Sequence, residues 1–285
     1  MTLDEAAIVP EISEPLEQSA GLALEWSRQY CEQARQGDAG CSWYHGSWQT
    51  LRLIGLFHSI RSDDDFFCRE LQSAVASGAR KFLVSGAADY ALLVRIATAA
   101  CAAGVNVKVT VLDRCATPLK LNKWYGAKAG VDVTTVRANI LDYSPETAFD
   151  VVCAHSFLCF FSPAGRQKLL KTWWDCLAPG GIVLTAQRVR QDDNTRLIRY
   201  GQAEVDQLAK KAQQLAGEVN GSINIDIGLA RELAHGYAKN HWTYCIRTSQ
   251  GIKTLFEQQG FGLEHLAPPG TGQPVPDIPG TPNTL

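Results

Sequence analysis

Residues 81–90 read KFLVSGAADY and decide how the central part of the chain folds. The apolar run Phe82–Val84 predicts a buried strand, Gly86 predicts a tight turn, and the following ALLVRIATAA predicts a helix. This succession places free backbone N–H groups at the carboxyl end of a strand, where α/β sheets bind nucleotide-like ligands. Dinucleotide sites usually have three glycines in this turn, so its single glycine fits a nicotinamide dehydrogenase poorly.

Strand-like and helix-like segments alternate after this point, which predicts a doubly wound, mostly parallel α/β sheet. The expected strands are 81–85, 107–112, 133–138, 149–154, 181–187 and 261–266, and the expected helices are 89–103, 117–129, 164–177 and 249–259. Residues 1–78, with helical patterns at 19–37 and 64–78, are expected to form a helical cap or arm. Residues 79–267 are expected to form the main domain. Within it, a helical insertion at 192–240 is expected to act as a lid, and residues 268–285 form a Pro/Gly-rich tail.

Composition excludes several classes of protein. The chain has 285 residues, 46% hydrophobic and 20% charged, with a net charge of −2. These values fit a soluble globular protein with a sizeable core and give no electrostatic footprint for nucleic acid. No apolar run predicts a membrane span, and the acidic N-terminus does not resemble a secretory signal, so a cytoplasmic location is expected. The sequence allows a homodimer.

The nine cysteines are odd in number and lack the paired CxxC spacing of common zinc motifs. In a cytoplasmic protein this pattern favours reduced thiols over a disulfide framework or a zinc site. We therefore expect no metal.

Polar residues stand at the ends of the expected strands. Asp113 ends the second strand, where a carboxylate can accept hydrogen bonds from both hydroxyls of a ribose. Asn139 follows the third strand with Ile140 beside it, a pair that suits the edge and the face of an adenine. His155 ends the fourth strand.

These pieces together resemble the class I S-adenosylmethionine-dependent methyltransferases. The resemblance lies in FLVSGAADY, VTVLDR, RANILDY, FDVVCAHSFL and LAPGGIVLTAQ, taken in this order. It implies a Rossmann-like α/β fold, with an N-terminal helical cap and a helical insertion after the fifth strand, and S-adenosylmethionine as cofactor. The cofactor-binding residues that it implies are Ser85, Gly86, Asp89, Asp113, Arg114, Asn139, Ile140 and His155.

Three features of the chain depart from that family. One is its end: the family ends in a strand hairpin, whereas this chain runs into its Pro/Gly tail, so the last strand could be missing or displaced. Alanine and tyrosine replace the later glycines of the first motif, and Asn139 replaces an aspartate that accepts from the adenine amino group. An asparagine carbonyl can accept the same hydrogen bond. Asp89 has two interpretations: it contacts the methionine amino group, or it caps the following helix.

The expected catalytic residues are His155, His45 and Tyr44. His155 faces the methyl-transfer position and could act as a general base, because imidazole titrates near neutral pH. Tyr44 and His45 belong to the aromatic stretch WYHGSW, which is expected to line the substrate pocket. Arg52, one turn further, could hold a substrate carboxylate, although an exposed arginine is the commoner case.

The leading hypothesis is methyl transfer from S-adenosylmethionine to a small molecule. One alternative is an enzyme of the same fold that cyclises or cleaves the aminocarboxypropyl part of the cofactor. Another is a non-catalytic cofactor-binding module, in which the missing glycines mark a dead site. The partners expected are a small-molecule substrate, no nucleic acid and no membrane.

Overall fold

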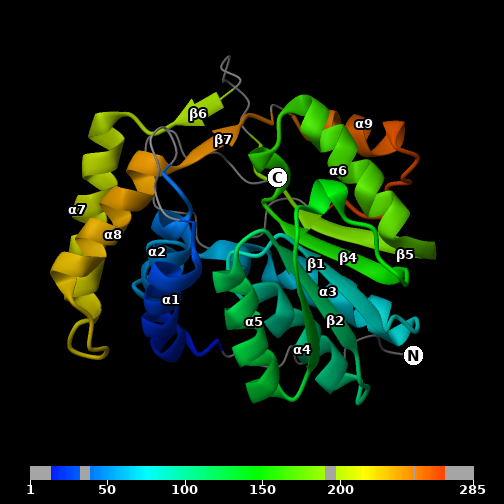
Figure 1. Cartoon of the computed structure of the whole chain (residues 1–285), viewed down its shortest axis with the longest axis horizontal. Coiled ribbons are helices and arrows are strands. Elements are labelled where there is room, and N and C mark those ends of the chain that lie inside the picture. The colour runs from blue at the N-terminus through cyan, green and yellow to red at the C-terminus, as the bar shows by residue number, and fades with distance from the viewer. Residues whose placement is uncertain (1–13, 33–38, 190–196, 247, 267–285) are drawn as a thin grey trace, which may run out of the picture.

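The computed structural model describes residues 14–32, 39–189, 197–246 and 248–266 (Figure 1). In this part of the chain, five strands form one sheet in the order β3-β2-β1-β4-β5, and every neighbouring pair is parallel. The strands are β1 (Lys81–Ser85), β2 (Lys108–Asp113), β3 (Asp132–Arg137), β4 (Phe149–His155) and β5 (Leu177–Ala186). The predicted doubly wound parallel sheet is therefore confirmed, and the strand order reverses between β1 and β4, where such sheets bind ligands.

Helices cover both faces of the sheet, as the unbroken apolar character of its strands requires. Phe82 and Val84 of β1 pack in one hydrophobic cluster, whereas Leu83 packs in another with Trp173. The first cluster includes α3 (Asp64–Ala76), α4 (Ala91–Ala102) and α5 (Ala116–Ala129), and the second includes α6 (Pro163–Cys176) and α9 (Ser249–Gln258). Trp173 is fully buried, and burial of one large apolar side chain stabilises a fold by about 1.5–3 kcal/mol.

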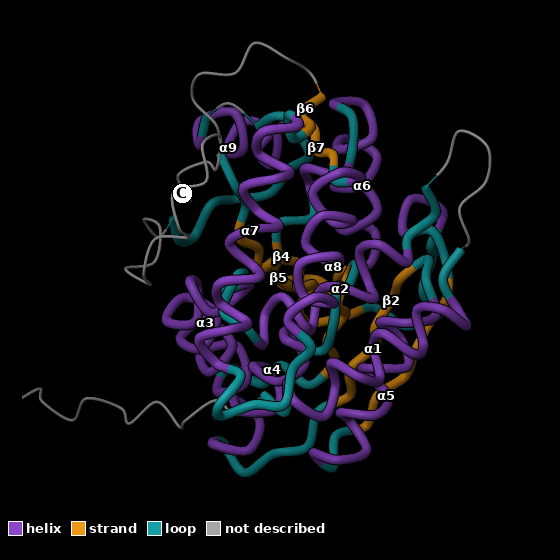
Figure 2. Tube along the Cα trace, turned by 90° about the vertical axis from the view of Figure 1, so that its left-hand side faces the viewer, coloured by secondary structure: helices purple, strands orange, loops and turns teal. Residues whose placement is uncertain are grey.

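A second group of helices stands beside the sheet, on the left in Figure 1 and facing the viewer in Figure 2. It comprises α1 (Leu16–Tyr30), α2 (Ser42–Leu53), α7 (Gln202–Val219) and α8 (Ile227–Asn240). Alanines of α7 and α8 are fully buried against one another and against α2, among them Ala212, Ala216 and Ala234. Small side chains let these helices approach closely, so residues at opposite ends of the sequence share one core.

The insertion after β5 also contributes a short antiparallel pair, β6 (Leu197–Arg199) and β7 (Trp242–Tyr244), which the sequence did not predict. Three short 3-10 helices complete the described elements: η1 (Ser59–Asp63), η2 (Ile140–Asp142) and η3 (Leu158–Phe160). Among the described helices, none combines the length and the apolar character that a membrane span requires.

Two expectations about the organisation need correction. Residues 261–266 do not form a sixth strand; Phe261 instead packs against Trp174 and Phe256, while Leu263 and Leu266 are exposed. The helix α3 does not belong to a cap over 1–78, because Phe67 and Leu71 are buried in the main core. The tail at 268–285 and the first part of the arm lie outside the described residues.

A buried ion-pair network fastens the N-terminal segment to the main domain. Arg52 of α2 donates to Glu14 and, at 2.6 Å, to Asp89, and Glu14 also accepts from Arg95 of α4. Arg52 is therefore a structural residue, neither exposed nor free to hold a substrate carboxylate. Although burial opposes it, the two guanidinium groups lower the pKa of Glu14.

Candidate active site

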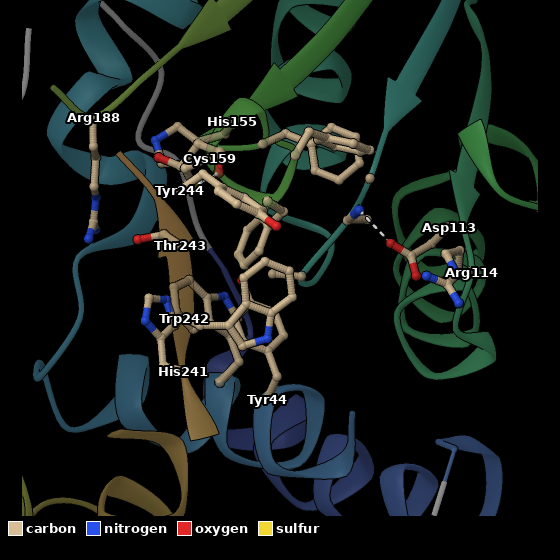
Figure 3. Close-up of a pocket in the computed structure, with 18 of the residues that line it drawn as sticks. Tyr44, Asp113, Arg114, His155, Cys159, Arg188, His241, Trp242, Thr243 and Tyr244 are labelled. Carbon is tan, nitrogen blue, oxygen red and sulfur yellow. Dashed lines mark hydrogen bonds between the residues drawn. The ribbon is translucent and has the colours of Figure 1, made fainter. Parts of the chain in front are cut away.

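A cavity of about 580 Å³ lies at the carboxyl ends of β1, β2 and β4. Its other walls come from α2, α8 and the β6–β7 pair. Figure 3 shows Asp113 and Arg114 on one side, Arg188 and Thr243 on the opposite side, and aromatic rings between them. Elements from the cap, the sheet and the insertion therefore meet at one pocket.

Gly86 forms the turn after β1 in a conformation that other residues rarely adopt, with φ of +74°. A Cβ atom at this position would lie 2.3 Å from the ring of Phe157, so the turn has no room for a side chain. Two hydrogen bonds fix the turn to the end of β2. Gly86 N–H donates to the Leu112 carbonyl at 2.9 Å, and Ala87 N–H donates to the Asp113 carboxylate at 3.0 Å. One glycine is enough to build this turn.

Asp113 stands at the end of β2 and lines the cavity. One carboxylate oxygen accepts from Ala87 N–H at 3.0 Å and the other from Cys115 N–H at 2.7 Å. Burial raises the pKa of Asp113, while His45 and the two N–H donors oppose that rise. Each oxygen keeps a lone pair for a further donor, so the carboxylate fits the two hydroxyls of a ribose. Arg114 lies beside it and is exposed (Figure 3).

Asn139 and Ile140 both line the cavity, but the amide of Asn139 already has partners. Its oxygen caps η2 by accepting from Leu141 N–H at 3.2 Å, and its nitrogen donates to Asp142 at 2.9 Å. Ile140 is buried and offers an apolar surface. The turn role of Asn139 is thus visible, whereas its contact with an adenine edge stays a prediction.

Ser85 and Asp89 differ from what the resemblance implied. The hydroxyl of Ser85 accepts from Trp173 Nε1 at 2.8 Å on the core side of β1, and Ser85 is not among the residues that line the cavity. Asp89 lines the cavity, but one of its oxygens accepts from Ala91 N–H at 2.8 Å and the other from Arg52 and, at 3.1 Å, from Trp48. Asp89 therefore binds the first N–H of α4 from two residues before the helix, and Arg52 already balances its charge.

His155 reaches the cavity from the end of β4 and is held by a residue that sequence reasoning missed. Its Nε2 lies 2.9 Å from Oδ2 of Asp63, at the end of η1. A carboxylate can only accept, so Nε2–H donates and Nδ1 carries the lone pair of the neutral ring. A histidine oriented in this way by a buried carboxylate has the arrangement of a general base.

An aromatic wall closes the side of the cavity opposite the sheet. Tyr44 stacks on Trp48 at 5.3 Å and on Tyr237 at 5.8 Å between ring centroids, and His241 stacks on Tyr237 at 5.0 Å. Burial raises the pKa of Tyr44, so its hydroxyl stays protonated and can donate a hydrogen bond. The cavity-lining side chains that sequence reasoning did not single out include Arg188, Tyr200, Tyr237 and Tyr244.

His45 borders the cavity, but its ring nitrogen Nδ1 contacts a cysteine and not the place expected for the acceptor. Its Nδ1 lies 3.6 Å from the sulfur of Cys31, inside a group of thiols. The structure therefore gives no support to His45 as a catalytic group at the acceptor.

Comparison with known proteins agrees with this arrangement. Residues 94–181 match a family model described as a methyltransferase domain. No curated protein sequence is significantly similar to the chain. Residues 94–181, which lie within the parallel sheet domain, are therefore similar to a methyltransferase domain.

Several solved structures resemble the chain. The S-adenosylmethionine-dependent methyltransferase SibL in its apo form is 20% identical over 91% of this chain and 67% of its own, with a TM-score of 0.47. A protein of Nostoc punctiforme PCC 73102, provisionally assigned as an O-methyltransferase, is 14% identical over 89% and 66%, with a TM-score of 0.49. The N-methyltransferase NodS of Bradyrhizobium japonicum WM9, in complex with S-adenosyl-L-homocysteine, is 21% identical over 51% and 74%, with a TM-score of 0.37. The chain spans about two thirds of the length of the first two.

Proposed function

We propose that the protein transfers the methyl group of S-adenosylmethionine to a hydroxyl group of a small aromatic molecule. The observation that carries this proposal is the pairing of His155 with Asp63 at a cavity that also contains Asp113. One cavity then holds a carboxylate suited to a ribose at the end of β2, an oriented base at the end of β4, and an aromatic wall opposite the sheet.

The cofactor's chemistry is a sulfonium methyl group that an acceptor atom displaces in line. The chain's own part is alignment and proton transfer. Asp113 would hold the ribose, Ile140 would cover the adenine, and the turn at Gly86 would lie under the methionine part. His155 Nδ1 would take the acceptor's proton, and Asp63 would stabilise the resulting imidazolium.

The acceptor class follows from the lining of the rest of the cavity. Tyr44, Tyr237 and Trp242 present ring faces and edges, which pack well against a planar aromatic compound. A volume of about 580 Å³ admits the cofactor with a small acceptor and leaves no room for a polymer. The net charge of −2 gives no support to a nucleic-acid substrate. A cytoplasmic location remains part of the proposal, and it is supported by nine cysteines that form no disulfide in the described part of the chain.

The experiment incubates the full chain with S-adenosylmethionine and a panel of small phenols and catechols, and follows methylated product by mass spectrometry. His155→Gln should lose turnover while keeping its affinity for S-adenosylhomocysteine. His235→Gln, on α8 and away from the cavity, is the matched control and should behave as wild type. Turnover that survives in His155→Gln would refute the base assignment.

The same assay separates the alternatives. Consumption of S-adenosylmethionine without any acceptor would point to cyclisation or cleavage of its aminocarboxypropyl part. Absence of S-adenosylhomocysteine binding would identify a non-catalytic protein and end the methyltransferase proposal.

A further inference from the structure

Four side chains that the cofactor site does not use converge at the junction of the cap and the main domain. Three are thiols and one is an imidazole, and their sulfur and nitrogen atoms all lie within 4.8 Å of one another. We call this group the Cys3His cluster; its members are Cys31, Cys41, His45 and Cys115.

The cluster is built from three helix ends. Cys31 directly follows α1, Cys41 and His45 stand one turn apart at the start of α2, and Cys115 precedes α5. The Cys41 N–H donates to the Glu32 carbonyl at 3.3 Å, and this hydrogen bond holds Cys41 next to the end of α1, where Cys31 lies. Three members are buried and Cys41 is partly buried, so the group is enclosed by protein.

Two distances between these atoms match those around a single tetrahedral ion. The sulfur atoms of Cys31 and Cys115 lie 3.5 Å apart, and the Cys31 sulfur lies 3.6 Å from His45 Nδ1. A tetrahedral zinc ion with Zn–S bonds of about 2.3 Å and a Zn–N bond of about 2.0 Å holds its ligand atoms about 3.6–3.8 Å apart. A disulfide would need sulfur atoms about 2.05 Å apart, and these cysteines form no disulfide in the structure.

We propose that the Cys3His cluster binds one structural zinc ion. Three thiolates and one imidazole are a common ligand set of structural zinc sites, and four protein ligands leave no open position for a substrate. Soft thiolates select zinc over magnesium or calcium. An iron–sulfur cluster would spread its ligands over several irons, whereas these four atoms lie within 4.8 Å of one another, close enough to bind a single ion. Binding releases the protons of the thiols.

The ion would connect the cap to the cofactor site. Cys115 donates its N–H to Asp113 at 2.7 Å, and His45 forms part of the cavity wall. The Thr117 hydroxyl donates to the Trp26 carbonyl at 3.3 Å and also lies 3.3 Å from the Cys31 sulfur, so its single hydrogen can turn to that sulfur once the thiol has lost its proton. Loss of the ion should therefore loosen α1 and α2 and weaken the binding of S-adenosylhomocysteine.

The test measures metal in the full chain, purified under reducing conditions without chelators or a metal-affinity column. Mass spectrometry with an inductively coupled plasma should find about one zinc ion per chain. Cys41→Ser and Cys115→Ser should lose it, and Cys101→Ser, an exposed cysteine at the end of α4, should keep it.

A second measurement covers the case in which the variants do not fold. Wild-type protein is titrated with an organomercurial in the presence of a zinc indicator, and the zinc should be released as the thiols react. Replacement by Co²⁺ should give the visible and near-ultraviolet bands of a tetrahedral thiolate site. A chain that binds no zinc after reconstitution, that contains iron with labile sulfide, or that holds a disulfide within the cluster would overturn the proposal.

Discussion

The substitution Gly86→Ala tests how the first turn is built. The new Cβ meets two penalties: a positive φ of +74° and a position 2.3 Å from the ring of Phe157. The backbone term costs about 1–2 kcal/mol, and forcing a methyl group into a filled space costs about 1–3 kcal/mol more. The free energy of unfolding should therefore fall by roughly 2–5 kcal/mol.

Gly130→Ala separates the two terms. Gly130 ends α5 with φ of +68°, and no atom lies within 4 Å of a Cβ built there. Only the backbone penalty of about 1–2 kcal/mol applies at this position. Urea denaturation followed by circular dichroism measures the free energy of unfolding of both variants. In thermal unfolding, each kcal/mol of difference should correspond to about 2–4 °C in melting temperature.

The double variant Gly86→Ala with Phe157→Ala completes the cycle. Because the second change removes the obstructing ring, the pair should be less destabilised than the sum of the two single changes. The reasoning is refuted if Gly86→Ala is no more costly than Gly130→Ala, or if the two changes in the pair simply add.

Glu14→Gln removes the carboxylate that two buried guanidinium groups share, while Arg52 keeps Asp89 and Arg95 keeps Asp64; denaturation should therefore show a loss of stability below the about 3–5 kcal/mol of a fully unpaired buried charge. Because the pKa of Glu14 is lowered in the folded state, its contribution is complete above the ordinary pKa of 4.5 and is lost as the pH falls through the folded value; the variant should lack this acid dependence. Asp63→Asn should reduce kcat about 100-fold while leaving cofactor affinity unchanged in calorimetry, because it removes the charge that holds His155; equal losses of both would argue against an orienting role. Since burial raises the pKa of Asp113, S-adenosylhomocysteine affinity should decline on acidification at a pH above the usual aspartate value of about 3.9; a decline only below that value would contradict the shift.

The sheet could be predicted from sequence because its signals are local. Apolar runs such as Phe82–Val84 and 149–154 mark strands buried on both faces, and Gly130 marks the end of a helix. The same logic failed at 261–266, where alternating apolar residues resembled a strand. A strand also needs a neighbour with free backbone groups, and a single chain segment does not reveal whether one is available.

The site was predictable only where its residues follow strand ends. Asp113, Ile140 and His155 line the cavity because parallel strands bring their carboxyl ends to one edge. Asp63 could not be found in this way, since it meets His155 across 92 positions of sequence. Its partner is set by how the N-terminal segment packs, and that packing carries no short-range signal.

The cysteines are a second case in which contacts between distant parts of the sequence could not be predicted. Local spacing argued against a zinc site because no CxxC pair is present. The structure joins Cys31 to Cys115 across 84 positions, through the docking of α1 on α5. Arg52 is a related case: its burial depends on Glu14 and Asp89, which neighbour it only in the folded chain.

The central claim is that the cavity binds the cofactor through Asp113, and calorimetric titration with S-adenosylhomocysteine tests it most directly. Wild-type protein should bind one equivalent, and Asp113→Ala should bind about 100-fold more weakly, because two hydrogen bonds to a charged group are lost. Asp132→Ala, an exposed residue at the opposite end of the sheet, is the control and should bind as wild type does. Equal affinity in the wild type and Asp113→Ala would contradict the account.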